Sequence, residues 1–130
     1  MAYVTPPAKE KVSPGIITAI AGTGGVVEGT FVAYDDGTAT TATAGALNVG
    51  VCMETADVGA QTSVKFFGLV LLSANGTTAI ATGDGLDPTT GGVAIKAATD
   101  TDVINAVALM PLASGTGKIL AKLGTFTLSV

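Results

Sequence analysis

The chain has 130 residues, a net charge of −4 at pH 7, 48% hydrophobic residues and only 12% charged residues. It contains no histidine, no arginine and a single cysteine, so it lacks the commonest general base and metal ligand, the usual bidentate phosphate ligand and any intrachain disulfide. These absences argue against most enzymes, against zinc sites of the usual Cys/His kind and against a nucleic-acid surface, which needs clustered basic side chains.

The first 15 residues differ in composition from the rest of the chain. Three prolines impose extended or turn backbone there, and the charged segment 9–11 is suited to solvent. Prolines also stand where a signal peptide has its apolar segment, so we expect no export. We predict that residues 1-15 form an extended N-terminal arm that docks on a neighbouring subunit or partner, with a frayed terminus as the alternative. The candidate contact residues of the arm are Tyr3, Val4, Pro6, Pro7, Lys9 and Lys11.

Short apolar segments separated by Gly-rich turns follow from residue 16 onward. The segments Ile16–Ile20 and Thr30–Tyr34 have the length and composition of strands. The sequence Asp35-Asp-Gly37 is typical of a tight hairpin turn, and it predicts that the second segment pairs with the run Thr38–Ala44. The apolar segment Leu47–Met53 has the length of a buried strand.

The second half of the chain continues this pattern. The strands predicted there are Ser63–Leu72, Thr77–Thr82, Val93–Lys96, Val103–Met110 and Lys118–Val130, and Asn75-Gly76 is predicted as a hairpin turn. Short helices at 103–110, near Asp57 or within 40–47 are alternatives. Turn signals about every ten residues predict an all-β fold, a compact β-barrel or β-sandwich, with 16-130 as a single domain.

Two stretches of the chain resemble each other. The segment from Gly29 to Gly37 is matched by that from Gly83 to Gly91, and 64–68 is matched by 120–124. The offset between matched glycines is roughly 55 residues, which is within the range of repeated structural units. We therefore predict two similar halves, at about 26-68 and 80-124, either from a duplication or from a similar strand order.

The chemistry-bearing side chains form no recognisable catalytic pattern. Cys52 lies within an apolar segment, so we predict a buried, unreactive thiol. The Gly-rich segments 22–25 and 115–118 lack the spacing of nucleotide-binding loops. Grouped carboxylates are typical of turns, although a weak cation site at Asp84 and Asp87 stays an alternative. We expect no catalytic, metal-binding or cofactor-binding residue and no enzymatic activity.

The apolar composition also bears on assembly. A soluble monomer usually keeps charge on its surface, so a chain this hydrophobic and poor in charge is expected to have part of its surface covered by partners. The longest apolar run, residues 66–72, is shorter than a membrane helix requires, so no membrane association is expected.

The order of glycine and turn motifs between roughly residues 16 and 124 is similar to that of a known family. The motifs are Gly29-x-x-Val-x-Tyr-Asp35, Asn48-Val-Gly-Val51, Gly59 to Val64 with Gly68, Ile80-x-x-Gly-Asp84-x-Leu86, Ala106 to Leu109, and Gly117-Lys-Ile-Leu120. This pattern resembles the small capsid cement, or head decoration, proteins of tailed bacteriophages.

The resemblance implies a structural virion protein that is made in the host cytoplasm. Such a protein assembles as a homotrimer on the outer surface of an icosahedral head, where it clamps the major capsid protein lattice, and it carries no catalytic residue. Two alternatives remain from the composition. One is a subunit of a bacterial surface or fibre assembly, and the other is a β-sandwich carbohydrate-binding module, which should expose aromatic side chains.

Overall fold

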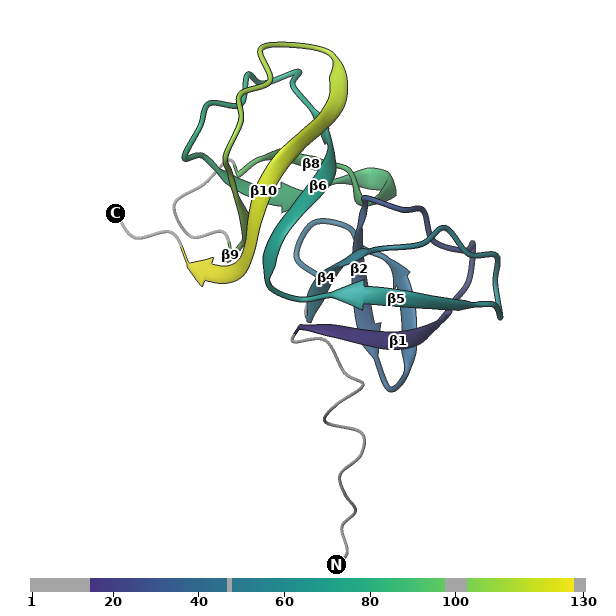
Figure 1. Cartoon of the computed structure of the whole chain (residues 1–130). Coiled ribbons are helices and arrows are strands. Elements are labelled where there is room, and N and C mark those ends of the chain that lie inside the picture. Colours follow the sequence, from purple (N-terminus) through teal and green to yellow (C-terminus); the bar gives the residue numbers. More distant parts are fainter. Residues whose placement is uncertain (1–14, 47, 98–102, 128–130) are drawn as a thin grey trace, which may run out of the picture.

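Two closed β-barrels make up the part of the chain that the computed structural model describes, residues 15–46, 48–97 and 103–127 (Figure 1). The first barrel contains β1 (Ile16–Ala21), β2 (Phe31–Asp35), β3 (Thr38–Thr41), β4 (Val49–Cys52) and β5 (Gln61–Lys65). The second contains β6 (Gly68–Asn75), β7 (Gly85–Pro88), β8 (Ala94–Lys96), β9 (Val103–Ala108) and β10 (Thr116–Thr127). The prediction of an all-β fold with short strands is confirmed.

The two barrels have the same strand order and the same pairing directions. The first ring runs β1-β3-β2-β4-β5, and the second runs β6-β8-β7-β9-β10. In each ring the first and third strands pair in parallel, and the other neighbours are antiparallel. The isolated bridge between Val26 and Ala56 has its counterpart between Ile80 and Leu112. The matched segments that begin at Gly29 and Gly83 thus lie in equivalent places, whereas 64–68 includes the end of β5 and 120–124 lies within β10. Common ancestry and the bounds 26-68 and 80-124 stay predictions.

The connection between the second and third strands differs between the barrels. In the first barrel Asp36 and Gly37 have φ values of 49° and 84°, which is the geometry of the two-residue hairpin turn predicted there. The equivalent connection in the second barrel is longer and contains a 3-10 turn, η1 (Thr90–Gly92). Among the described residues, η1 is the helical segment. The three segments predicted as alternative helices, where they are described, form strands or turns instead.

One apolar core extends across both barrels. Four buried residues of the first barrel belong to the same cluster as the interior of the second barrel: Phe31, Ala42, Val49 and Val51. The interior of the first barrel is filled by smaller side chains, namely Ala19, Ala21, Val26, Val32, Ala39, Cys52, Ala56 and Val64. Burial of apolar side chains between the barrels stabilises their packing against each other, because each buried side chain removes apolar surface from water.

The edge of β6 lies against the first barrel. The backbone N–H of Ser73 donates a hydrogen bond to the carbonyl oxygen of Gly29, at 2.7 Å. The Nζ of Lys65 donates to the carbonyl oxygen of Leu69, at 2.6 Å. These two bonds satisfy backbone groups of β6 that the parallel strand β8 does not reach, because β8 pairs with β6 at Ala74.

Three sequence predictions about the strands are wrong. The segment 63–72 was expected as one strand, but it is divided between β5 and β6, and the second of these begins at Gly68 with a φ of 98°. The segment 77–82 forms only the isolated bridge at Ile80. Asn75-Gly76 is not a hairpin turn, because the next strand begins ten residues later at Gly85.

The strand β7 was missing from the predicted set. Its residues include a glycine and a proline, and both residue types are depleted in strands, so its composition resembles a loop. Pro88 stands at the last position of the strand, where it pairs with Ala94. A short strand with this composition is stabilised by its neighbours on both sides rather than by its own propensity.

The predicted arm lies outside the described residues, and so do its candidate contacts Tyr3, Val4, Pro6, Pro7, Lys9 and Lys11. The described chain begins at Gly15, whose carbonyl oxygen accepts a hydrogen bond from the N–H of Phe66 at 2.6 Å. Gly15 therefore lies beside the connection between the two barrels. None of the helical segments described is long and apolar enough to cross a bilayer.

Candidate functional site

Cys52 is fully buried, which confirms the prediction of an inaccessible thiol. Its S–H donates to the carbonyl oxygen of Glu54 at 2.9 Å, and its Sγ lies 3.4 Å from the hydroxyl of Thr62. The same Thr62 hydroxyl donates to the Glu54 carbonyl at 2.7 Å. This thiol closes a turn at the end of β4 and offers no reactive group to solvent.

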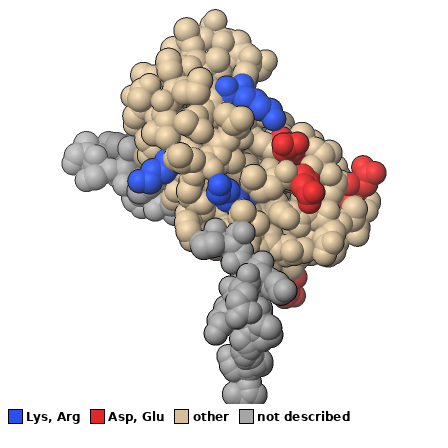
Figure 2. All heavy atoms as spheres, in the orientation of Figure 1, with Lys and Arg blue, Asp and Glu red and all other residues tan. Residues whose placement is uncertain are grey.

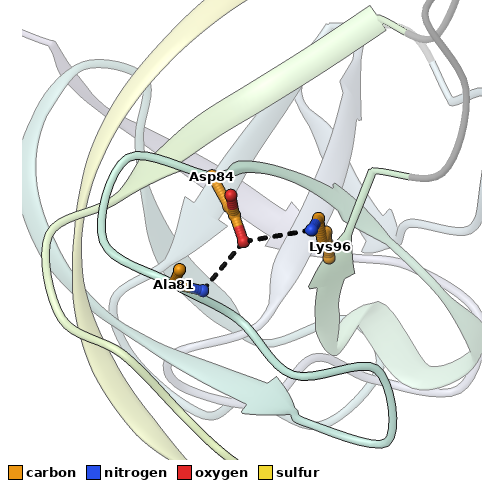
Figure 3. Close-up of polar contacts among 3 residues, drawn as sticks. All are labelled: Ala81, Asp84 and Lys96. Carbon is orange, nitrogen blue, oxygen red and sulfur yellow. Dashed lines mark hydrogen bonds and ion pairs between the residues drawn. The ribbon is translucent and has the colours of Figure 1, made fainter.

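The carboxylates of Asp84 and Asp87 have separate structural partners. One oxygen of Asp84 accepts from the N–H of Ala81 at 2.8 Å and lies 3.6 Å from the Nζ of Lys96 (Figure 3). Asp87 accepts from the side-chain amide of Asn105 at 3.0 Å. Across the described residues no group of three potential metal ligands is found. Asp84 therefore closes a turn, and Asp87 links β7 to β9.

The turn closed by Asp84 has an equivalent in the first barrel. There Thr30 precedes β2 as Asp84 precedes β7, and its hydroxyl donates to the carbonyl oxygen of Val27 at 2.7 Å. Each turn also contains a backbone hydrogen bond to the carbonyl oxygen three residues earlier. The N–H of Thr30 donates to Val27, and the N–H of Asp84 donates to Ala81. A polar side chain at this position thus serves the fold in both barrels.

Replacing Asp84 with alanine is expected to lower the free energy of unfolding by about 1 kcal/mol, because a backbone N–H loses its acceptor. Asp84→Asn should cost less, since an amide oxygen can accept the same bond. Lys96→Ala should change stability by less than about 0.5 kcal/mol, because the ion pair is exposed to solvent. Urea unfolding followed by circular dichroism would measure all three, and an equal loss in the three variants would contradict this order.

An exposed apolar stripe crosses β6 and β10 on the outer face of the second barrel. The side chains of Leu69 and Leu71 are 55% and 57% exposed, whereas those of Val70 and Leu72 point into the barrel. The register places Leu71 beside Leu120, which is half-buried. We call Leu69, Leu71 and Leu120 the leucine stripe.

Lysines border the leucine stripe. Lys122 pairs with Leu69 across the sheet, and Lys118 lies two pairs beyond the end of the stripe, opposite Ser73. Lys65 bonds the carbonyl of Leu69. Figure 2 shows this face as largely uncharged, with Lys side chains at its margins and Asp and Glu side chains gathered over the first barrel. The described acidic residues of the first barrel are Glu28, Asp35, Asp36, Glu54 and Asp57.

A cavity of about 260 Å³ opens beside the leucine stripe, where the two barrels meet. Most of its lining is apolar, with one carboxylate and one ammonium group at its wall. The lining residues are Glu28, Gly29, Cys52, Met53, Leu69, Val70, Leu71 and Lys118. Such a hollow can receive an apolar side chain of a partner.

Sequence reasoning missed the leucine stripe. The run 69–72 is apolar at every position, so it predicted a strand buried on both faces. The structure buries one face and exposes the other. Such a run is compatible with an exposed contact face, but the run alone cannot say which face is covered.

The aromatic side chains do not form a carbohydrate platform in the described chain. Tyr34 packs edge-to-face against Phe66, with ring centroids 5.8 Å apart. Phe67 is 54% exposed and lies over Gly15. Stacking of sugars needs several exposed ring faces together, and these residues provide one isolated ring.

The comparisons with known proteins identify a shared fold. No protein-family model and no curated protein sequence matches the chain. The solved structure of the head fiber gp8.5 N base of bacteriophage phi29 matches with a TM-score of 0.62 and 19% sequence identity. The match covers 88% of this chain and 98% of that chain, so it extends over both barrels.

Proposed function

We propose that this chain is a structural protein of a bacteriophage head, and that it decorates the outer surface of the capsid shell and stabilises the lattice of the major capsid protein. The observation that carries the proposal is the fold shared with the base of a phage head fibre, over 98% of the chain in that structure. The resemblance of the glycine and turn motifs to head decoration proteins supports the same assignment.

The surface of the molecule fits a role in assembly. The leucine stripe is an apolar area bordered by lysines, and exposed apolar areas of this kind are typical of protein contacts. The described thiol and the Asp84 and Asp87 carboxylates are engaged in turns and strand links. We therefore infer that the chain acts through protein contacts made by its surface.

Stabilisation of a capsid follows from linkage. A protein that binds the assembled shell but not its free subunits stabilises the shell by about 2.7 kcal/mol per site when its free concentration is a hundredfold above Kd. A homotrimer makes three such contacts at once, so modest contacts act together through multivalency. Because many copies bind one closed shell, weak binding at each site is sufficient to stabilise the shell.

Co-sedimentation with empty heads of the phage that encodes the chain would test this function. The purified protein should bind heads in a saturable way, and light scattering should give the mass of a trimer. Decorated heads should also resist heating or chelation better than undecorated heads. A protein that stays in the supernatant at saturating concentration would contradict the proposal.

The arm supplies a second prediction about head binding. Deleting residues 2–13 should leave the barrels folded, because the described fold begins at Gly15, yet it should reduce head binding by at least about tenfold through the loss of a docking segment. Circular dichroism would check the fold and co-sedimentation the binding. A chain in which Lys9 and Lys11 are replaced by glutamine is the control for charge alone. Full binding by the deleted chain would show that the arm is not the docking segment.

A further inference from the structure

The tip of the first barrel carries exposed apolar and acidic side chains together. The loops 22–30 and 53–60 are held side by side by the bridge between Val26 and Ala56. On these loops Val27 and Val58 are 56% and 64% exposed. Three exposed carboxylates lie on the same loops, so we define the acidic tip as Val27, Glu28, Glu54, Asp57 and Val58.

The acidic tip and the leucine stripe are complementary in chemistry. Each combines exposed aliphatic side chains with charges of one sign, carboxylates at the tip and ammonium groups around the stripe. The ion pair found among the described residues joins Lys96 to Asp84, and neither residue belongs to the two surfaces. Among the described residues Glu28, Glu54, Asp57, Lys118 and Lys122 form no ion pair, whereas the ammonium group of Lys65 bonds the carbonyl of Leu69.

The two barrels differ only in part at these surfaces. The pair Leu69–Lys122 has an equivalent in the first barrel, Ile16–Lys65, whereas the leucines next to it do not. The pair Leu71–Leu120 corresponds to Thr18–Ser63 in the first barrel, since each follows an inward-facing pair in the same register. The loops of the second barrel that correspond to the acidic tip, 77–83 and 109–115, contain no charged residue. The leucines at 71 and 120 and the carboxylates of the acidic tip are therefore not shared by the two barrels.

The two surfaces adjoin each other at the cavity between the barrels. Glu28 of the tip and Leu69, Leu71 and Lys118 at the stripe all line this cavity. A contact between two different patches of identical chains is heterologous, and it forms a closed ring when the rotation between copies closes.

We propose that the leucine stripe of one copy binds the acidic tip of the next copy, and that this contact closes the homotrimer. The inference rests on the trimer of the proposed function and names its contact surfaces. Val27 and Val58 of one copy contact the stripe and the cavity of the next. Lys118 and Lys122 face carboxylates of the neighbouring tip.

Charge reversal tests the contact. Lys118→Glu with Lys122→Glu should convert the trimer to monomer and raise its dissociation constant by at least about a hundredfold, because like charges then face each other across the contact. Glu28→Lys with Glu54→Lys should have the same effect. All four substitutions in one chain restore opposite charges and should restore the trimer. Multi-angle light scattering measures the mass, and circular dichroism shows that each variant is folded.

Matched controls and outcomes follow from the geometry. Asp35→Lys makes the same kind of change outside the tip and should leave the trimer intact. The proposal is overturned by a monomeric natural chain, by trimers that survive either reversal, or by the absence of rescue in the fourfold variant. Reversed variants that stay trimeric but lose head binding would place the stripe against the capsid shell instead. Head co-sedimentation of the natural chain separates the two proposals: rescue without head binding would contradict the proposed function alone.

Discussion

Replacing Leu72 with alanine is expected to lower the free energy of unfolding by about 2–5 kcal/mol, the range for a buried leucine that leaves a cavity. Leu72 is fully buried and belongs to the apolar cluster that joins both barrels. A small domain is stable by only about 5–15 kcal/mol, so this single change removes a large share of the total. Urea unfolding monitored by circular dichroism would measure the loss.

Leu109→Ala is the matched control for this variant. Leu109 is also in the second barrel, is 38% exposed and lies outside the leucine stripe. Its truncation should cost clearly less than that of Leu72, because more than a third of its surface is already in water and solvent can fill the space that is left. Equal losses in the two variants would contradict the position of Leu72 in a shared core.

The second large effect is expected at Gly92, where the second barrel lies against the first. A Cβ on Gly92 would lie 2.5 Å from the carbonyl oxygen of Phe31 and 3.1 Å from the Cβ of Thr30, both in the first barrel. Its φ of 73° adds a conformational cost of about 1–2 kcal/mol for an L residue. Overpacking adds about 1–3 kcal/mol, so Gly92→Ala should destabilise the protein by about 2–5 kcal/mol.

The neighbouring Gly91 separates these two causes. Its φ of 78° is similar, but a Cβ there would meet no atom within 4 Å. Gly91→Ala should therefore show only the conformational cost of about 1–2 kcal/mol. Thermal and urea unfolding of the two variants would measure the difference, and losses of the same size would mean that Gly92 does not hold the barrels together.

Local chemistry explains which structural predictions were correct. The hairpin at Asp36 and Gly37 depends on residues that tolerate positive φ, and this preference acts within the turn itself. The burial of Cys52 follows from an apolar segment of strand length. Both features depend on neighbours in the chain, so the sequence predicted them.

The wrong predictions share a different physical cause. The break at Phe66 and Phe67 lies in a continuous apolar run, and the strand β7 contains a glycine and a proline. Strand pairing with distant segments decides both cases, because pairing satisfies the backbone of a poor strand former and can leave strong strand formers unpaired. Local propensity carries no information about these partners.

For the leucine stripe, too, local sequence predicted one property and distant contacts decided another. Composition predicted that partners cover part of the molecule, and this stays a prediction. Which side chains form the surface could not be predicted, because Leu69, Leu71 and Leu72 are identical residues within one apolar run. Their exposure of 55%, 57% and 0% is decided by the face of β6 that closes the barrel.

The sequence by itself determined the all-β class and the hairpin turn at Asp36 and Gly37, because these depend on the preferences of residues close together in the chain. The tertiary structure alone decided that the strands close into two barrels, that one core extends across both and that leucines remain exposed beside an acidic neighbour. Closure and burial depend on contacts between segments far apart in the chain, and residue order does not specify which faces meet.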